Sequence, residues 1–466
     1  MLSPKKLVKS FFYMLGGSAG ELLLSIAITI SLARFLEPTQ LGVLVAVEAF
    51  LDLFKFFFYF GFNNSIMRQA AQDLDGFESG LDKAIGNAFV IKSLMLLPLC
   101  LLVIMVSILT FKESFLRELV FILLAVYVLE SYASIFGIAR RAKGQFKLVS
   151  GIIVLNKVLR LATIFLVLGT GHDLIWLAYA FLIEKNIRLI ISAITTLKII
   201  QPKVDLLTIG SLAKHCLGYA FVDPLQGIQG KIDKVMLNNL LSSSAVAFYS
   251  VPAKLNQAFE NIMNTVCGVF VPNLHSSLAA DEVYYKKTTS YMFKYFTAAA
   301  ALAAILVYGF SKPALLILFG EKYSSSLAIA PLFAYVCFLT IVERTPELVM
   351  VTHASHKLRA FYKTVTIALN IILTFVLIRS IGLVGSVYAT IIANTIKLLW
   401  QFYLTRKFID IKDFLLISAP ALLLLQVINP YLLLAVYLIY LFAILDINYA
   451  RDFIKRNRTE NQSSDS

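Results

Sequence analysis

Apolar stretches of about 18–25 residues, separated by short polar segments, follow one another along almost the whole chain. A stretch of that length crosses a bilayer as a helix. The pattern therefore predicts an all-α multi-pass membrane protein with about 12–14 transmembrane helices, and we expect about 14. The expected spans lie near residues 11–33, 41–62, 84–110, 116–139, 149–169, 174–196, 215–237, 245–273, 291–318, 327–351, 361–379, 384–404, 414–428 and 431–447.

Lysine and arginine residues are distributed unevenly between the two sides of these spans. With the N-terminus in the cytoplasm, 24 of the 42 fall in cytoplasmic segments and six in segments on the opposite side, Lys234 and Lys322 among them. The remaining twelve lie within the spans. Because positive residues favour the cytoplasmic side of a membrane, we expect both termini to be cytoplasmic.

The order of landmarks along the chain indicates an internal repeat. Residues 36–50 align loosely with residues 241–255, and later landmarks recur in the same order at nearly the same offset. Six spans separate the copies, so both have the same orientation in the membrane. We expect two six-helix lobes, residues 1–200 and 201–407, related by a parallel pseudo-twofold repeat. Residues 408–450 would form an extra C-terminal helix pair, and residues 451–466 a cytoplasmic polar tail.

Polar residues within the spans gather on the first two helices of each expected lobe, at steps of three or four residues that place them on one helical face. Span 41–62 carries Glu48, Asp52, Lys55, Tyr59 and Asn63, and span 245–273 carries Ser250, Lys254, Gln257, Asn261 and Asn264. Span 11–33 carries Gly17, Glu21, Ser25 and Thr29, and span 215–237 carries Tyr219, Asp223, Gln226, Gly230 and Asp233. Equivalent positions in the two lobes predict a polar cavity between them.

A lysine or arginine at the centre of a bilayer costs at least about 2.5–3.5 kcal/mol, so it normally faces a partner or water. The twelve within the spans are Lys55, Lys92, Lys157, Arg160, Lys185, Arg188, Lys231, Lys254, Lys294, Lys312, Arg344 and Lys397. Helical spacing allows local pairs, namely Asp52 with Lys55, Glu184 with Arg188, and Arg344 with Glu343 or Glu347. Lys294 and Lys312 lie near span ends and can reach the headgroups. Lys157, Arg160 and Lys397 have no counter-ion in their own helices, so they are candidates for binding an anion.

Composition narrows the function classes. The chain is 59% hydrophobic with a net charge of +14, but the positive residues are dispersed in short loops, which argues against nucleic-acid binding. Its four cysteines are far apart and lie in apolar segments, so we expect neither disulfides nor a metal site. No nucleophile or phosphate-binding loop occurs, so we expect no enzyme and no cofactor.

Several short segments resemble one transporter family. The stretch at residues 32–38 with Leu41-Gly42 resembles the first-loop pattern of Wzx-type polysaccharide flippases, of the multidrug/oligosaccharidyl-lipid/polysaccharide exporter superfamily. Later landmarks at 233–250, 318–323 and 381–385 also fit, and the resemblance covers about residues 10–405. It implies a fold similar to that of the MATE transporters, with two six-helix lobes around a cavity that opens alternately to each side. It also implies transport of undecaprenyl-pyrophosphate-linked oligosaccharides across the bacterial inner membrane, for O-antigen or other surface polysaccharide.

Under this hypothesis the substrate is a lipid-linked oligosaccharide with a pyrophosphate that needs cations and a glycan that needs amides. The candidate substrate-binding residues are Lys55, Lys254, Lys157, Arg160, Lys397, Gln257 and Asn261. Glu21, Asp52 and Asp223 are candidates for coupling to protons or sodium. Membrane lipids, a polysaccharide polymerase and a chain-length regulator are the further partners to consider.

Two other classes remain open. A MATE-type drug/cation antiporter would share the fold but would more often have an acidic or aromatic cavity. A membrane glycosyltransferase or polysaccharide polymerase would usually carry a large extracytoplasmic loop with catalytic residues. Here the expected outer loops are short, so the flippase ranks ahead of both.

Overall fold

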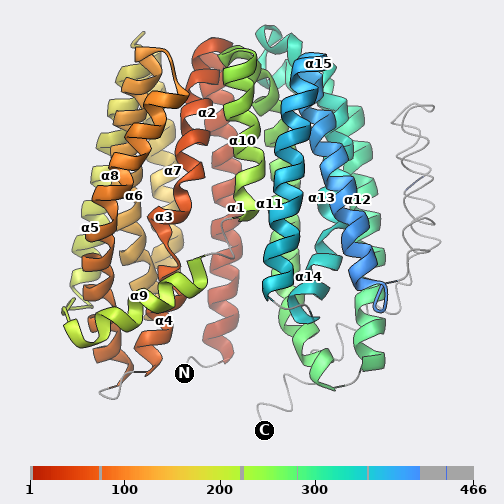
Figure 1. Ribbon diagram of the computed structural model, residues 1–466. Helices are drawn as coiled ribbons and strands as arrows, with labels where there is room; N and C mark the ends of the chain where they lie inside the picture. Colours follow the sequence, from red (N-terminus) through yellow and green to blue (C-terminus); the bar gives the residue numbers. More distant parts are fainter. Residues whose placement is uncertain are drawn as a thin grey trace. The chain divides into compact units, whose positions relative to one another are not determined.

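The computed structural model describes residues 4–72, 76–220, 225–280, 282–353, 356–409 and 437. Within these ranges every regular element is a helix (Figure 1). In chain order they are α1 (Pro4–Phe35), α2 (Pro38–Leu53), α3 (Lys55–Tyr59), α4 (Phe62–Gln72), α5 (Phe77–Thr110), α6 (Ser114–Ala142), α7 (Phe146–Gly169), α8 (Leu174–Leu197), α9 (Leu206–Ala220), α10 (Leu225–Leu240), α11 (Ser243–Ala280), α12 (Glu282–Phe319), the 3-10 helices η1 (Glu321–Ala328) and η2 (Ala330–Leu332), α13 (Phe333–Val342), α14 (Arg344–His353) and α15 (His356–Thr405). The spans expected at 414–428 and 431–447, and the polar tail at 451–466, lie outside the described residues except for Tyr437.

Several of these helices are long and apolar enough to cross a membrane. In the described ranges they are α5, α6, α7, α12 and the Phe361–Thr405 part of α15. A sixth span is counted if the bent pair Glu321–Ala328 and Ala330–His353 acts as one. The chain is therefore a multi-pass membrane protein.

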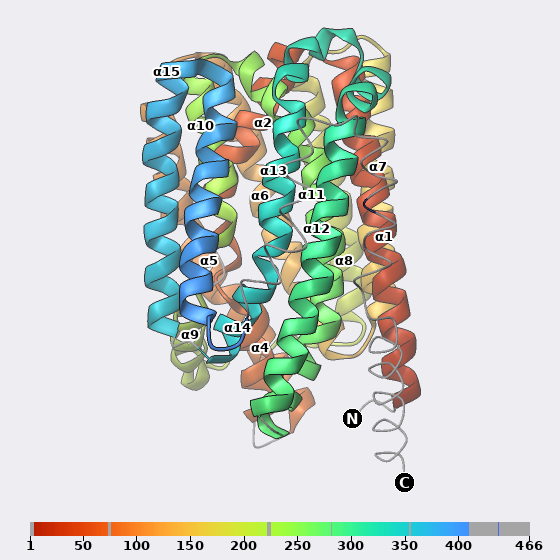
Figure 2. The same ribbon diagram turned by 90° about the vertical axis from the view of Figure 1, so that its right-hand side faces the viewer.

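Helix α15 contains two of the expected spans, at 361–379 and 384–404. Its backbone leaves helical geometry at Ile381 and at Gly382, where φ is +65°. Glycine adopts this left-handed conformation without steric cost. The two arms therefore lie side by side and are joined by a sharp bend (Figure 2).

The expected span at 41–62 is a broken helix. Helix α2 ends at Leu53, α3 is one short turn, and Phe60 and Gly61 have positive φ of 37° and 66° before α4 begins. A bulky side chain at positive φ is rare and strained. The prediction of one continuous polar face from Glu48 to Asn63 is therefore wrong, because the face is interrupted after Leu53 and again after Tyr59.

The expected span at 215–237 is also wrong as a single helix. Its residues are divided between the end of α9 and most of α10, and the connection at 221–224 lies outside the described residues. Figure 1 shows α9 lying across the upright helices beside it, at the end where α1 begins.

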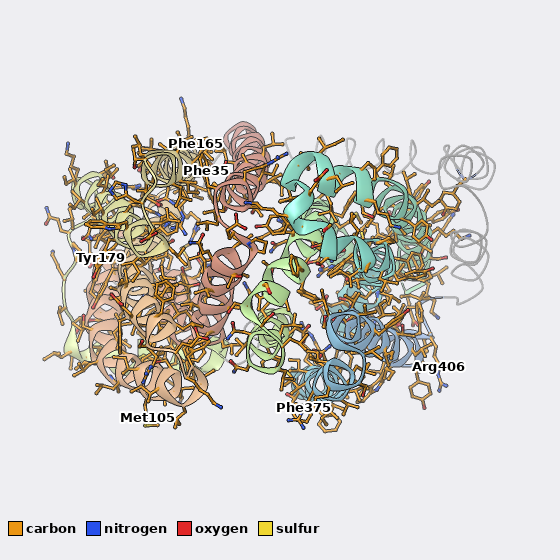
Figure 3. The ribbon with its side chains drawn as sticks, turned by 90° about the horizontal axis from the view of Figure 1, so that it is seen from above. Phe35, Met105, Phe165, Tyr179, Phe375 and Arg406 are labelled. Atoms are coloured by element: carbon orange, nitrogen blue, oxygen red, sulfur yellow. The ribbon has the colours of Figure 1, made fainter. Side chains whose placement is uncertain are left out.

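The chain forms two compact units, one made of Met1–Lys254, Ala314–Ile329 and Ser355–Ala393, and the other of Leu255–Pro313, Ala330–Ala354 and Asn394–Ser466. In the first unit α1 packs against α7, α6 against α8, α4 against α5, and α2 against α10. Phe35 and Phe165 meet edge to face between α1 and α7, with ring centroids 5.4 Å apart (Figure 3). Met105 and Tyr179 lie on the outer margin of this unit and are 57% and 44% exposed, as expected of lipid-facing side chains (Figure 3).

Candidate functional site

A series of alternating acids and bases links four helices of the first unit. Arg160 on α7 lies 3.3 Å from a Glu48 carboxylate oxygen on α2 and 3.5 Å from a Glu184 oxygen on α8. Lys185 on α8 lies 3.4 Å from Glu184 and 3.0 Å from Glu130 on α6, and Glu130 also pairs with Arg188. We call this set the charge chain, with members Glu48, Arg160, Glu184, Lys185, Glu130 and Arg188. Three acids face three bases, so its charges balance.

Further contacts fix the middle of the charge chain. The Glu184 side chain is 1% exposed. The amide of Asn156 donates to Glu184 at 3.1 Å and accepts from Lys185 at 3.0 Å in the orientation that satisfies both atoms. The Arg160 guanidinium lies over the Phe181 ring, 3.2 Å from its centroid. Arg160 is thus held as part of the scaffold, because removing it would leave the three carboxylates of the charge chain with two bases, and the buried Glu184 would have to rely on Lys185.

The structure adds counter-ions that lie on other helices, and it contradicts one pair expected from the sequence. Arg160 and Lys157 do have counter-ions, supplied by other helices; Lys157 lies 4.0 Å from Glu21 on α1. The expected Glu184–Arg188 pair is replaced by the pairs described above. Spacing within one helix reveals only partners on that helix, so contacts between helices were missed.

Asp52 is a shared counter-ion and not an isolated carboxylate. It pairs with Lys231 of α10, accepts a hydrogen bond from the Tyr127 hydroxyl at 2.7 Å, and lies 3.9 Å from Lys55. The expected Asp52–Lys55 pair is therefore present, although the Lys55 side chain remains 55% exposed. Because its charge is compensated, Asp52 is poorly suited to hold a coupling ion.

Several lysines lie around Asp52 and Glu48. The Lys254 charge interacts with those of Lys231, Lys157, Asp52 and Glu48. Lys234, placed on the outer side by the sequence interpretation, interacts with Lys231, Lys254, Asp52 and Glu48 instead. We call Lys55, Lys157, Lys231, Lys234 and Lys254 the cation cluster. Among the described residues of the first unit, its lysines outnumber the carboxylates that face them, which favours binding of an anion.

The second unit holds the remaining sequence-predicted site residues. Lys397 lies 2.5 Å from Glu343, so it too has a counter-ion on another helix, and Arg344 pairs with Glu347 at 3.5 Å as expected. Gln257 and Asn261 are exposed on α11. These two exposed amides stay candidates for contact with a polar ligand, whereas Lys397 is paired with Glu343.

A buried carboxylate that the sequence interpretation did not select lies on α10. Asp233 is 0% exposed and accepts hydrogen bonds from the Thr374 hydroxyl at 3.1 Å and the Thr390 hydroxyl at 3.4 Å, both on α15. Asn370, one turn before Thr374 on the same helical face, is 0% exposed and neither of its amide atoms has a protein partner. Oxygen atoms from a carboxylate, hydroxyls and an amide are the ligands that hard cations prefer.

Asp233 differs from the three coupling residues expected from the sequence. Glu21 is 44% exposed beside Lys157, Asp52 is paired, and Asp223 lies outside the described residues. The described part of the chain contains no group of three His, Cys, Asp or Glu side chains that could hold a metal ion. The buried Asp233 carboxylate with its two hydroxyl donors has the chemistry to accept a proton or to bind a cation.

Two cations join the ends of α1 and α12 within the first unit. Arg34 donates to the Leu318 carbonyl at 2.8 Å and to the Ile317 carbonyl, at the C-terminal end of α12. In return, Lys322 donates to the Arg34 and Leu36 carbonyls at the end of α1, at 3.0 and 2.7 Å. Each cation thus satisfies unpaired carbonyls of the other helix and complements its dipole. We call this arrangement the reciprocal cap.

Replacing Arg34 with alanine is expected to loosen the reciprocal cap. Loss of charge-assisted hydrogen bonds at this partly exposed site should cost about 1.5 kcal/mol, or roughly tenfold in the open population. A cysteine placed at Leu36, which is 2% exposed, reports the opening through its rate of labelling by a membrane-impermeant thiol reagent. The matched control is Arg117→Ala, whose weak contact is with the Lys112 carbonyl in its own neighbourhood. Equal labelling rates in both variants would contradict the expectation.

The family model described as polysaccharide biosynthesis protein matches residues 31–328. The chain belongs to this family. The match contains the charge chain, the cation cluster and Asp233, and it confirms the resemblance found in the sequence. No curated protein matches this polysaccharide biosynthesis protein at a significant level.

Solved structures of transporters have the same fold as this polysaccharide biosynthesis protein. Lipid II flippase MurJ in an inward closed conformation aligns with a TM-score of 0.75 and 15% identity, covering 96% of this chain and 100% of that chain. A multidrug resistance MATE family transporter of the MOP superfamily aligns in its inward-facing form (TM-score 0.61, 14% identity, 83% of this chain and 95% of that chain) and in its outward-facing form (0.62, 14%, 86% and 95%). At these identities the likeness establishes the fold alone, the helical fold shared by MurJ and the MATE transporters.

Proposed function

We propose that this protein moves undecaprenyl-pyrophosphate-linked oligosaccharide units across the bacterial inner membrane by alternating access, for the synthesis of surface polysaccharide. Membership of the polysaccharide biosynthesis family and a fold shared with a lipid-linked flippase support this function. The observation that carries the proposal is the cation cluster, because a pyrophosphate within a membrane protein needs several positive partners.

The cation cluster gives the substrate head a place to bind. Lys55 and Lys254 are the proposed pyrophosphate ligands, with Lys157 beside them. Arg160 is proposed to act in support, since its ion pairs hold helices of the first unit together, and Lys397 is proposed to contribute from the second unit. The exposed amides of Gln257 and Asn261 offer hydrogen bonds to glycan hydroxyls.

Coupling is proposed at Asp233. A carboxylate with 0% exposure that accepts from two threonine hydroxyls, with the Lys234 charge nearby, can take up a proton or a sodium ion. Lys231 lies two residues before it on α10 and pairs with Asp52. A change of charge at Asp233 would therefore alter the electrostatic interactions of α10, the helix that also carries Lys231 and Lys234 of the cation cluster.

The remaining features of the proposal concern organisation in the cell. Residues 1–200 and 201–407 are the proposed moving lobes, followed by the helix pair at 408–450, with both termini in the cytoplasm. A polysaccharide polymerase and a chain-length regulator are the proposed protein partners. Transport needs no covalent chemistry, so the protein is not proposed to be an enzyme.

Replacing Lys254 with alanine is expected to reduce transport of the lipid-linked oligosaccharide by roughly 10–100-fold, because a hydrogen bond to a charged group contributes about 1.5–3 kcal/mol. Lys55→Ala should act in the same direction. The measurement is recovery of surface glycan in a deletion strain, with protein levels checked in the membrane fraction. Lys112→Ala, an exposed lysine in the loop between α5 and α6, is the control. Full recovery by both site variants would refute these assignments.

The MATE neighbours favour one rival function, the export of drug-like cations. A cationic-dye efflux assay separates the two functions, since the cation cluster would repel such substrates. Efflux by the wild type that Lys254→Ala leaves unchanged or increases, without any effect on surface glycan, would favour the rival.

A further inference from the structure

Helix α9 is held rigidly against α5 by a polar cap at its start. The Asp205 carboxylate accepts from the Leu207 N–H and the Thr208 hydroxyl, both at 3.0 Å, as a helix N-cap does. Asn87 on α5, which is 0% exposed, accepts from the Asp205 N–H at 2.9 Å and donates to the Thr208 hydroxyl at 3.0 Å. A side chain at Gly86 would collide with the Lys203 backbone, so this approach requires glycine. The start of α9 therefore has a fixed position.

The inner face of α9 belongs to the core of the first unit. Leu212 and Cys216 are 0% exposed in an apolar cluster that includes Phe62 and Ile66 of α4 and Ile85 of α5. Spacing of three and four residues puts the inner side chains on one helical face. Helix α9 is thus docked along its length and lies across the upright helices (Figure 1).

The first turn of α9 and the segment before it expose large aliphatic side chains. Leu207 is 94% exposed, Leu206 76% and Val204 56%. Lys203 and Lys214 flank these residues, and both are exposed. Aliphatic side chains bordered by lysines, on a helix lying across the spanning helices, are the hallmarks of a segment that lies in the membrane interface.

The surface around α9 is positively charged. Lys198 and Arg68 are exposed near its two ends. Burial and the charges of Arg68 and Lys214 lower the pKa of His215, so these two cations lie close to it. The Asp205 carboxylate accepts the cap bonds, and the Asp82 carboxylate accepts from the Gln201 N–H at 3.2 Å. This end of the protein also carries the Arg140 to Lys147 loop, which agrees with the cytoplasmic leaflet.

We propose that α9 is an interfacial anchor whose aliphatic side chains enter the cytoplasmic leaflet while its cations bind the phosphate groups of anionic phospholipids. The anchor surface comprises Arg68, Lys198, Lys203, Val204, Leu206, Leu207 and Lys214. Charge complementarity selects anionic over zwitterionic lipid, and the transverse position of α9 places the aliphatic side chains at the depth of the headgroup boundary. This anchor is independent of the substrate that the transporter carries.

Lipid selectivity is tested by thermal stabilisation of the purified full-length protein in detergent. Phosphatidylglycerol should raise the unfolding temperature more than phosphatidylcholine. The half-saturating phosphatidylglycerol concentration should rise roughly 30-fold in K203Q/K214Q, since each basic residue contributes about fivefold. K112Q/R117Q, with the same charge change at the other end of α5 and α6, should behave as wild type. The proposal would be overturned if phosphatidylcholine or soluble glycerol phosphate stabilised the protein as much as phosphatidylglycerol. It would also be overturned if K203Q/K214Q and K112Q/R117Q had the same half-saturating phosphatidylglycerol concentration.

Insertion is tested separately by fluorescence. In a background with the four native cysteines replaced by alanine, L207C labelled with NBD and reconstituted in nanodiscs containing brominated lipid should show blue-shifted, quenched emission. E113C, in the loop between α5 and α6, should show water-like emission. Water-like, unquenched emission at position 207 would show that α9 stays out of the bilayer or that this face binds a protein, and would overturn the proposal.

Discussion

Replacing Arg160 with methionine is expected to lower the free energy of unfolding by about 3–5 kcal/mol. Arg160 compensates both Glu48 and the almost fully buried Glu184, and its guanidinium also covers the Phe181 ring. Methionine keeps much of the volume but removes the charge, so the three carboxylates of the charge chain would face two bases, and the almost fully buried Glu184 would have to rely on Lys185. The unfolding of detergent-solubilised protein in increasing SDS, followed by circular dichroism, measures the change.

Two companion variants identify the cause of this loss. Lys157→Met lies one turn away on α7, where the lysine is 29% exposed and 4.0 Å from Glu21, so a cost below about 1 kcal/mol is expected. Adding Glu184→Gln to Arg160→Met should recover part of the stability by removing an uncompensated charge. If the two substitutions lowered the free energy of unfolding additively, so that the double variant was less stable than Arg160→Met, the charge chain would not act as a unit.

Replacing Asp233 with asparagine is expected to reduce transport by about 10–100-fold, the range found when groups that support a bound ion are removed. Asparagine preserves the size of the side chain and can still accept from Thr374, so the fold should be retained. The variant cannot exchange a proton or neutralise a sodium ion. Its residual transport rate should therefore lose the sodium or pH dependence that coupling at Asp233 would give the wild type.

Transport of lipid-linked oligosaccharide into proteoliposomes, with sodium and pH gradients applied in turn, is the measurement. Glu113→Gln, an exposed carboxylate at the start of α6, serves as the control and should transport normally. An Asp233→Asn protein with unchanged rate and ion dependence would exclude this coupling site. The same assay on Thr374→Val, which removes one hydroxyl from Asp233, should give a smaller loss.

The sequence is most informative for features that depend on a single helix, such as its length and hydropathy. Predominantly apolar spans at 84–110, 116–139 and 149–169 predict α5, α6 and α7, because length and hydropathy suffice to define a membrane helix. Helix breaks are harder to predict. The polar residues keep a helical spacing through Phe54 and Phe60, but the backbone is not helical at these two positions. Periodicity shows which residues share a face and does not show whether the helix is continuous. Gly61 and Gly382 were the available signals for two of the breaks.

Predicting the candidate site was limited by contacts that are distant in sequence. Arg160 and Glu48 are 112 residues apart, and Lys231 and Asp52 are 179 apart, so helical spacing could not pair them. Asp233 was recognised as polar but not selected, because its distinguishing neighbours are threonines on α15. Lys234 was assigned to an outer loop because it lies near the end of an expected span. In the structure its charge interacts with those of Lys231, Lys254, Asp52 and Glu48.

Under the proposed function, the reciprocal cap has a consequence for the change from one conformation to another. Because Arg34 caps α12 while Lys322 caps α1, neither helix end can separate without uncapping both at the same time. A partly open arrangement would exchange the hydrogen bonds of both cations for hydrogen bonds to water, at a net cost in free energy. The closed arrangement should therefore yield in one cooperative step, and a substrate or ion that favours opening would meet a threshold instead of a gradual response.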